Sequence, residues 1–204
     1  MTSTARMRQR EQTRRALLHE ARALFATKGY AAVGLSEIVA AASVTKGALY
    51  HHFDSKADLF TAVLTQVQEE VGAQVSAAAD AESDPWTQLT TGCATFLRSC
   101  ADPSIQRIML IDGPAVLGWH EWRAMDEANS ARHLHDALQS LIDHGVLPPQ
   151  PAAPLTRLLS GAMNEAALWL ATDPGALPET VTALDRLLTG LRISDPTPDR
   201  PLTP

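Results

Sequence analysis

Seven residues whose side chains suit nucleic-acid recognition lie within one short stretch of the chain. They are Thr45, Lys46, Gly47, Tyr50, His51, His52 and Lys56. A lysine reaches guanine acceptors or phosphates, a glycine lets the backbone approach a groove, and phenol and imidazole groups bond phosphates and meet thymine methyls. A helix that begins beside Lys56 adds backbone N–H groups that attract phosphate. This pattern predicts a surface for the major groove of double-stranded DNA, with helix packing as the alternative role for Tyr50 and His52.

Two short helices are expected to hold this surface, over residues 35–42 and 46–52. A small core would pack them against a first helix, built from Ile38, Val39, Ala42, Val44, Leu49 and Phe53. A tight turn between two short helices, the second rich in polar groups, is typical of a helix-turn-helix. We place that motif at about residues 34–53. Ser43 in the turn is expected to take a left-handed backbone conformation, at a cost of ~1–2 kcal/mol.

The charge of the chain is distributed unevenly. The whole sequence carries −6, but residues 1–60 carry a net +4, so the remainder carries −10. A basic N-terminal part suits phosphate, and an acidic body repels DNA and stays in solution. Three arginines (Arg6, Arg8 and Arg10) form a basic arm over residues 1–11. This arm either reaches into a minor groove or is a mobile tail that adds nonspecific attraction.

Residues 12–60 resemble the tetracycline-repressor (TetR) family of regulators. The resemblance rests on Phe25, on Gly29-Tyr30 and on the run Val44-Thr-Lys-Gly-Ala-Leu-Tyr-His-His-Phe-Asp-Ser-Lys56, with threonine in place of the usual serine at 45. It implies that Thr45, Lys46, Gly47, Tyr50, His51, His52 and Lys56 contact DNA. It also implies a homodimer on a pseudo-palindromic operator, because two half-sites multiply the modest affinity of one small module.

Helical periodicity continues through the rest of the chain, so the predicted fold is all-α with nine helices. After the first three, within residues 12–53, we expect helices at 55–79, 84–100, 102–112, 119–144, 154–172 and 177–193. Ser55 is the predicted N-cap of the fourth helix, with Asp58 in the acidic position of a capping box. Residues 61–193 would form a regulatory and dimerisation domain. Residues 194–204, with four prolines, are expected to be a disordered tail.

Large adaptable side chains are dense in the middle helices. A pocket for an unidentified small apolar effector is predicted from Met109, Trp119, Trp122, Met163, Asn164 and Glu165. Methionine and tryptophan suit a loosely specific apolar pocket, and Asn164 or Glu165 would supply a polar anchor. Ordinary core packing is the alternative for each of these side chains.

The last two helices carry the predicted dimer surface. Small residues in one helix and a leucine stripe in the next define it: Ala162, Ala166, Leu184, Leu187, Leu188 and Leu191. By the family resemblance, two such helices from each subunit form a four-helix bundle.

The predicted function is a cytoplasmic, sequence-specific repressor that a small apolar ligand releases from its operator. A ligand-independent dimeric repressor and a ligand-binding bundle with a vestigial DNA domain are the alternatives. The sequence contains no phosphate loop, nucleophile elbow or two-histidine zinc motif, so we expect neither an enzyme nor a cofactor or metal. It has no apolar run long enough for a membrane span, and Cys93 and Cys100 lie ~10.5 Å apart if both occupy one helix, too far for a disulfide.

Overall fold

The computed structural model describes residues 2–192, with side chains from residue 6 onward except that of Ser130. Every regular element in this range is helical, which confirms the all-α prediction. The α-helices are α1 (Thr2–Lys28), α2 (Leu35–Ala41), α3 (Lys46–Tyr50), α4 (Lys56–Asp80), α5 (Pro85–Cys100), α6 (Pro103–Gln106), α7 (Gly113–Leu117), α8 (Trp119–Ala128), α9 (Ser130–Asp143), α10 (Ala152–Leu170) and α11 (Leu177–Thr189). The predicted disordered tail lies outside the described residues.

Three segments differ in detail from the sequence prediction. The basic arm is not separate from the first helix, because α1 already begins at Thr2. A π-helix, η1 (Arg107–Asp112), connects α6 directly to α7. The expected helix over residues 119–144 is divided at Asn129, whose φ and ψ of −113° and −99° are not helical. The Asn129 side chain donates a hydrogen bond to the Met125 carbonyl at 2.9 Å, so it competes with the main-chain ladder at this break.

Side-chain caps begin several of the helices. Ser55 accepts a hydrogen bond from the Asp58 N–H at 3.0 Å, as the capping box predicts. The Asp58 carboxylate in turn accepts from the N–H of Asp54, one residue before the cap, at 3.0 Å. Asp84 and Asp102 cap α5 and α6 in the same way, each just before a proline in the first turn. These local signals explain why the predicted starts of α4, α5 and α6 are accurate.

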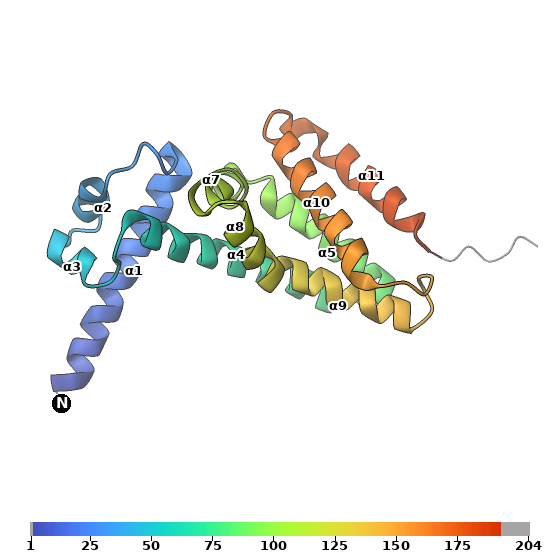
Figure 1. Cartoon of the computed structure of the whole chain (residues 1–204), viewed down its shortest axis with the longest axis horizontal. Helices are drawn as coiled ribbons and strands as arrows, with labels where there is room; N and C mark the ends of the chain where they lie inside the picture. Colours follow the sequence, from blue (N-terminus) through green and yellow to red (C-terminus); the bar gives the residue numbers. More distant parts are fainter. Residues whose placement is uncertain (1, 193–204) are drawn as a thin grey trace, which may run out of the picture.

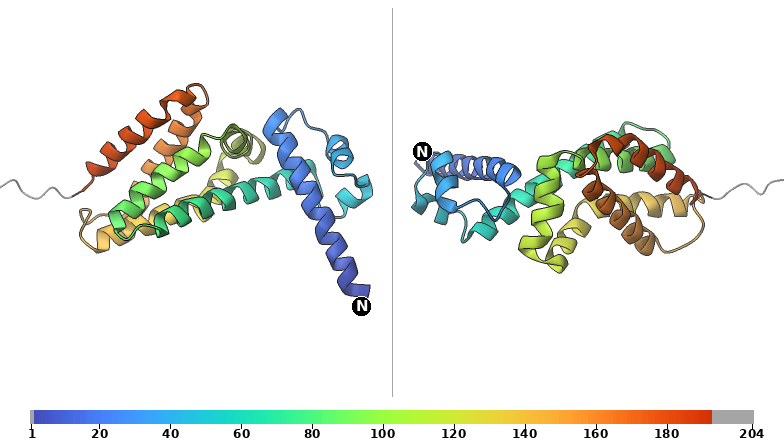
Figure 2. Two further views of the ribbon diagram at one scale, coloured as in Figure 1. Left: turned by 180° about the vertical axis from the view of Figure 1, so that it is seen from behind. Right: turned by 90° about the horizontal axis from the view of Figure 1, so that it is seen from above.

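The helices form a head and a body joined by α4. Figures 1 and 2 show α1–α3 as the head, and α4 running from it along the body, where α10 and α11 lie at the far side. Val63, Val67 and Val71 of α4 are buried in a core that continues from head to body. At the start of α4, Phe60 packs edge-on against Phe25 and Tyr30, with ring centroids 5.3 and 5.1 Å away. A displacement of α4 would therefore be transmitted to the head.

A second junction joins the body to the end of α1. Asp112, the last residue of η1, accepts a hydrogen bond from the Tyr30 N–H at 2.8 Å. Beside it, Gly29 has a φ of +81°, and a Cβ there would lie 2.8 Å from the guanidinium of Arg107. The positive φ favours glycine at this turn, and the Arg107 side chain would have to move to admit a larger residue. The π-helix thus contacts the turn from which the helix-turn-helix begins.

The turn between α2 and α3 gives a test of backbone strain. Ser43 has a φ of +53°, as the sequence predicted. We expect Ser43→Gly to raise the free energy of unfolding by about 0.5–1 kcal/mol, because the relieved strain exceeds the added chain entropy. The matched change Ser36→Gly, at an exposed position of α2, should lower it by up to about 0.5 kcal/mol, because glycine has a lower helix propensity than serine. Denaturant unfolding measures both, and equal signs would contradict the assignment.

Candidate functional site

The helix α3 presents a polar face to solvent. Leu49 is fully buried and anchors the helix, whereas Lys46, Gly47, Tyr50 and His51 are exposed. Thr45 is the N-cap, and its hydroxyl accepts a hydrogen bond from the Ala48 N–H at 3.1 Å. The exposed main chain at Gly47 leaves room for close approach by another molecule. The sequence-predicted residues of this helix are therefore brought together on one accessible face.

His52 lies between this face and the basic residues of α1. It is half-buried and borders a surface hollow whose other members include Arg8, Arg10, Arg14 and Arg15. Burial lowers the pKa of His52, and the positive charges of Arg10 and Arg14 lower it further. A pKa below the usual 6.5 keeps this imidazole neutral at pH 7. The arginines of α1 thus extend a positively charged surface beside α3.

Lys56 lies at the start of α4, as the sequence predicted, and its ammonium is engaged within the head. Its ammonium donates a hydrogen bond to the Val33 carbonyl at 2.7 Å. It also lies 4.1 Å from the centroid of the Tyr30 ring. These contacts hold the loop before α2 against the start of α4. The geometry assigns Lys56 a bracing role within the head, while Lys46 is exposed.

The body contains a cavity of about 200 Å³ between α4, α5, α8, α9 and α10. Residues of all five helices line it, among them Gly72, Val75, Cys93, Phe96, Asp126, His133 and Met163. Of the six residues predicted for a ligand pocket, Met163 alone is in this lining. Burial raises the pKa of Cys93 to about 12, so its thiol stays protonated at neutral pH.

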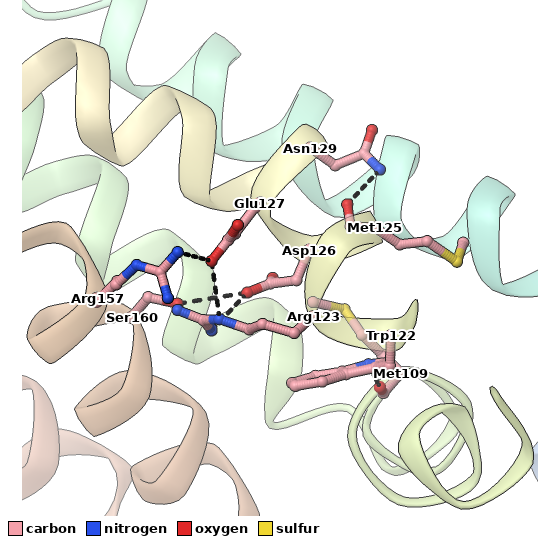
Figure 3. Close-up of polar contacts among 9 residues, drawn as sticks. All are labelled: Met109, Trp122, Arg123, Met125, Asp126, Glu127, Asn129, Arg157 and Ser160. Carbon is pink, nitrogen blue, oxygen red and sulfur yellow. Dashed lines mark hydrogen bonds and ion pairs between the residues drawn. The ribbon is translucent and has the colours of Figure 1, made fainter. Parts of the chain in front are cut away.

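The other predicted pocket residues lie elsewhere. Trp122 is buried, and its indole N–H donates to the Met109 carbonyl at 2.8 Å, within the π-helix (Figure 3). Trp119 packs against Trp122 with tilted rings whose centroids are 5.1 Å apart, but it is 61% exposed. Asn164 is buried, and its Oδ1 has no hydrogen-bond partner among the described residues. Glu165 is exposed. These residues do not converge on a common space.

A polar cluster at the cavity edge was missed by sequence reasoning. Arg123 donates to the carboxylate of Asp126 at 2.9 Å and to the Ser160 hydroxyl at 3.1 Å. Glu127 forms ion pairs with Arg157 at 3.0 Å and with Arg123 at 3.5 Å (Figure 3). Asp126 and Ser160 also line the cavity. The Arg-x-x-Asp spacing on one helix face was the available signal, but burial of the pair depends on α10.

The predicted dimer residues are divided between the surface and the core. Leu187 is 53% exposed and Ala162 is exposed, whereas Leu188 is 1% exposed and lies in the chain's own core. Ala166, Leu184 and Leu191 are partly buried. Two apolar residues of α10 add to the exposed set, Leu158 at 72% and Trp169 at 49%. The outer faces of α10 and α11 thus expose several large apolar side chains.

None of the described helices is both long and apolar enough to cross a bilayer.

Two family models match the sequence. "Bacterial regulatory proteins, tetR family" matches residues 17–63, and "Tetracyclin repressor-like, C-terminal domain" matches residues 86–191. These segments coincide with the head and first turns of α4, and with the body from α5 to α11.

Individual relatives agree with the family models. The Transposon Tn10 TetC protein of Escherichia coli is 30% identical over 149 residues, covering 73% of this chain and 75% of that protein. A probable acrEF/envCD operon repressor of E. coli is 39% identical over 99 residues, 48% of this chain and 45% of that one. A TetR-family regulator from Pectobacterium atrosepticum has a crystal structure with a TM-score of 0.74 and 35% identity, covering 91% of this chain and 97% of that one. The chain is therefore a DNA-binding transcriptional regulator and belongs to the TetR family.

Proposed function

We propose that this regulator is a repressor that binds a pseudo-palindromic operator as a homodimer and releases it when a small molecule enters the body. The observation that carries the proposal is the exposed polar face of α3, anchored by buried Leu49. Thr45, Lys46, Gly47, Tyr50, His51 and His52 are the proposed DNA-contacting residues. Such a face suits a recognition helix in the major groove, and the arginines of α1 would add phosphate contacts. An intact face of this kind opposes a vestigial DNA domain.

The proposed dimer forms through α10 and α11. Leu158, Ala162, Trp169 and Leu187 supply its exposed apolar and small residues. Two helices from each subunit would then pack together and bury these side chains. A dimer fixes the distance between two heads, so half-site spacing follows from the protein.

Release requires that a change in the body alters the position of the head, and two sets of contacts support such coupling. Helix α4 lines the cavity at Gly72 and Val75 and packs on the head at Phe60. The π-helix contacts the α1 turn through Asp112 and Tyr30. A molecule that favours one position of α4 would change the spacing of the two heads. Tenfold release needs only about 1.4 kcal/mol of differential affinity between the two states.

Operator binding at several salt concentrations tests the first part of this proposal. Operators are selected from random DNA with the full-length protein. Affinity should then fall steeply with salt, with a logarithmic slope of about −0.9 for each phosphate neutralised. Selected sequences should be pseudo-palindromic, with one dimer bound to each. Selection of unrelated sequences, with a slope near zero, would contradict the proposal.

The ligand step is tested separately by DNA release. A molecule shown to bind the free protein is added to the operator complex, and the fraction bound is measured. Loss of operator binding at saturating ligand is the expected result. A molecule that fills the cavity and leaves operator affinity unchanged would favour the ligand-independent repressor, because equal binding to both states shifts no equilibrium.

A further inference from the structure

The size of the cavity limits what it can hold. Its volume is about 200 Å³. An engineered cavity of about 150 Å³ with apolar walls accepts benzene, so this space suits a molecule of one or two rings. Long acyl chains and extended polycyclic molecules would have to protrude from its open side. Leu89, Phe96 and Met163 give it apolar walls, and the protonated thiol of Cys93 adds no charge.

One end of the cavity is buried and polar. Asp126 lines it, and its side chain is almost completely buried. The hydrogen bonds from Arg123 and Ser160 both reach its Oδ2, at 2.9 and 3.4 Å. Among the described residues no hydrogen bond reaches Oδ1, which leaves a carboxylate oxygen able to accept one. A ligand hydroxyl would donate to this oxygen in place of water, and a hydrogen bond to an ionised carboxylate is stronger than one between neutral groups.

The charges around Asp126 are already balanced. Arg123 pairs with Asp126 and Glu127, and Arg157 pairs with Glu127. Two guanidinium groups therefore face two carboxylates (Figure 3). A charged ligand would have to take Asp126 or Arg123 from this existing pair, which leaves one charge of the cluster without its partner and costs several kcal/mol. An anion would in addition meet Asp126 at the buried end and Asp80 at the exposed end of α4.

We propose that the effector is an uncharged one- or two-ring molecule with a hydroxyl group, which donates a hydrogen bond to Oδ1 of Asp126 while its ring lies between α4, α5 and α10. This inference rests on the proposed function only in taking the cavity as the effector's site. It assigns Asp126, rather than Asn164 or Glu165, as the polar determinant of binding.

A matched series of naphthalenes tests the class of ligand on the unaltered protein. Binding to the full-length protein is measured by calorimetry at pH 7, without DNA. 2-Naphthol should bind at least tenfold more tightly than 2-methoxynaphthalene, which has the same rings and oxygen but no donor. The anion 2-naphthoate and the cation 2-naphthylmethylammonium should bind more weakly still. The proposal is overturned if either ion binds as tightly as 2-naphthol, or if none of the four binds.

Two variants locate the binding site. Gly72→Leu should abolish 2-naphthol binding, because the side chain projects into the cavity. Gly72→Ala should retain it, since a Cβ there meets only the His133 ring, at 4.0 Å. Asp126→Asn should weaken binding at least tenfold, whereas Asp136→Asn, an exposed aspartate of α9, should not. Unchanged affinity in both Gly72→Leu and Asp126→Asn would place the ligand elsewhere and refute the proposal.

Failure of this inference is separable from failure of the proposed function. If 2-naphthol binds as expected and the operator complex persists, the ligand class is correct and the release step is wrong. If a charged molecule occupies the cavity and releases the operator, the release step is correct and the ligand class is wrong. Thermal unfolding of each variant verifies that it is folded before binding is measured.

Discussion

Replacing Leu158 or Leu187 with aspartate is expected to convert the protein to a monomer and to lower operator affinity by at least a hundredfold. Both side chains are exposed on the outer faces of α10 and α11. In the proposed dimer each aspartate would be buried without a partner, at a cost of several kcal/mol. A monomer then loses the gain from binding two half-sites together. Sedimentation velocity measures the assembly, and a titration of labelled operator measures the affinity.

The control for this prediction is Ile111→Asp. Ile111 is exposed to nearly the same extent as Leu187 but belongs to η1 rather than to α10 or α11. The Ile111→Asp protein should remain a dimer with near-normal helical content. That result would show that a surface charge alone does not dissociate the protein. Leu188→Asp is not informative about assembly, because Leu188 is 1% exposed and its replacement disrupts the chain's own core. Dimeric Leu158→Asp and Leu187→Asp proteins would exclude these helices as the interface.

Lys46→Ala is expected to weaken operator binding by at least thirtyfold and to relax base preference at one position of each half-site. The ammonium is exposed at the start of α3, the helix proposed to enter the major groove. A good contact to a base edge contributes about 1–3 kcal/mol, and the dimer makes it twice. A combined loss of about 2 kcal/mol corresponds to roughly thirtyfold. Selection of operators by the variant protein would report the changed base preference.

Lys56→Ala is the matched comparison for Lys46→Ala. Its ammonium is engaged by the Val33 carbonyl and the Tyr30 ring, so its loss should lower the free energy of unfolding of the head by about 1–2 kcal/mol. Operator affinity should fall less than in Lys46→Ala, with no change in base preference. The two variants could instead show the same decrease in salt slope and the same, unchanged base preference. In that case Lys46 contacts a phosphate and not a base.

The sequence alone determined the helices and the recognition motif, because both depend on local signals. Ser55 and Asp58 begin α4 through contacts within four residues, and the left-handed Ser43 turn is equally local. The polar face of α3 follows from a buried Leu49 within a five-residue helix. The break at Asn129 and the π-helix were not predicted, since their hydrogen-bond patterns leave no periodic signature in the sequence.

The tertiary structure alone decided which of two similar side chains became buried. Trp119 and Trp122 lie on one helix, yet one is exposed and the other packs on η1. Leu187 and Leu188 are adjacent, and one faces solvent while the other is in the core. Periodicity gives the apolar stripe of a helix but not the neighbour that covers it. The burial of Asp126 beside the cavity has the same origin. The Arg-x-x-Asp spacing is common on exposed helix faces, and this pair is removed from water only because α10 packs on α8.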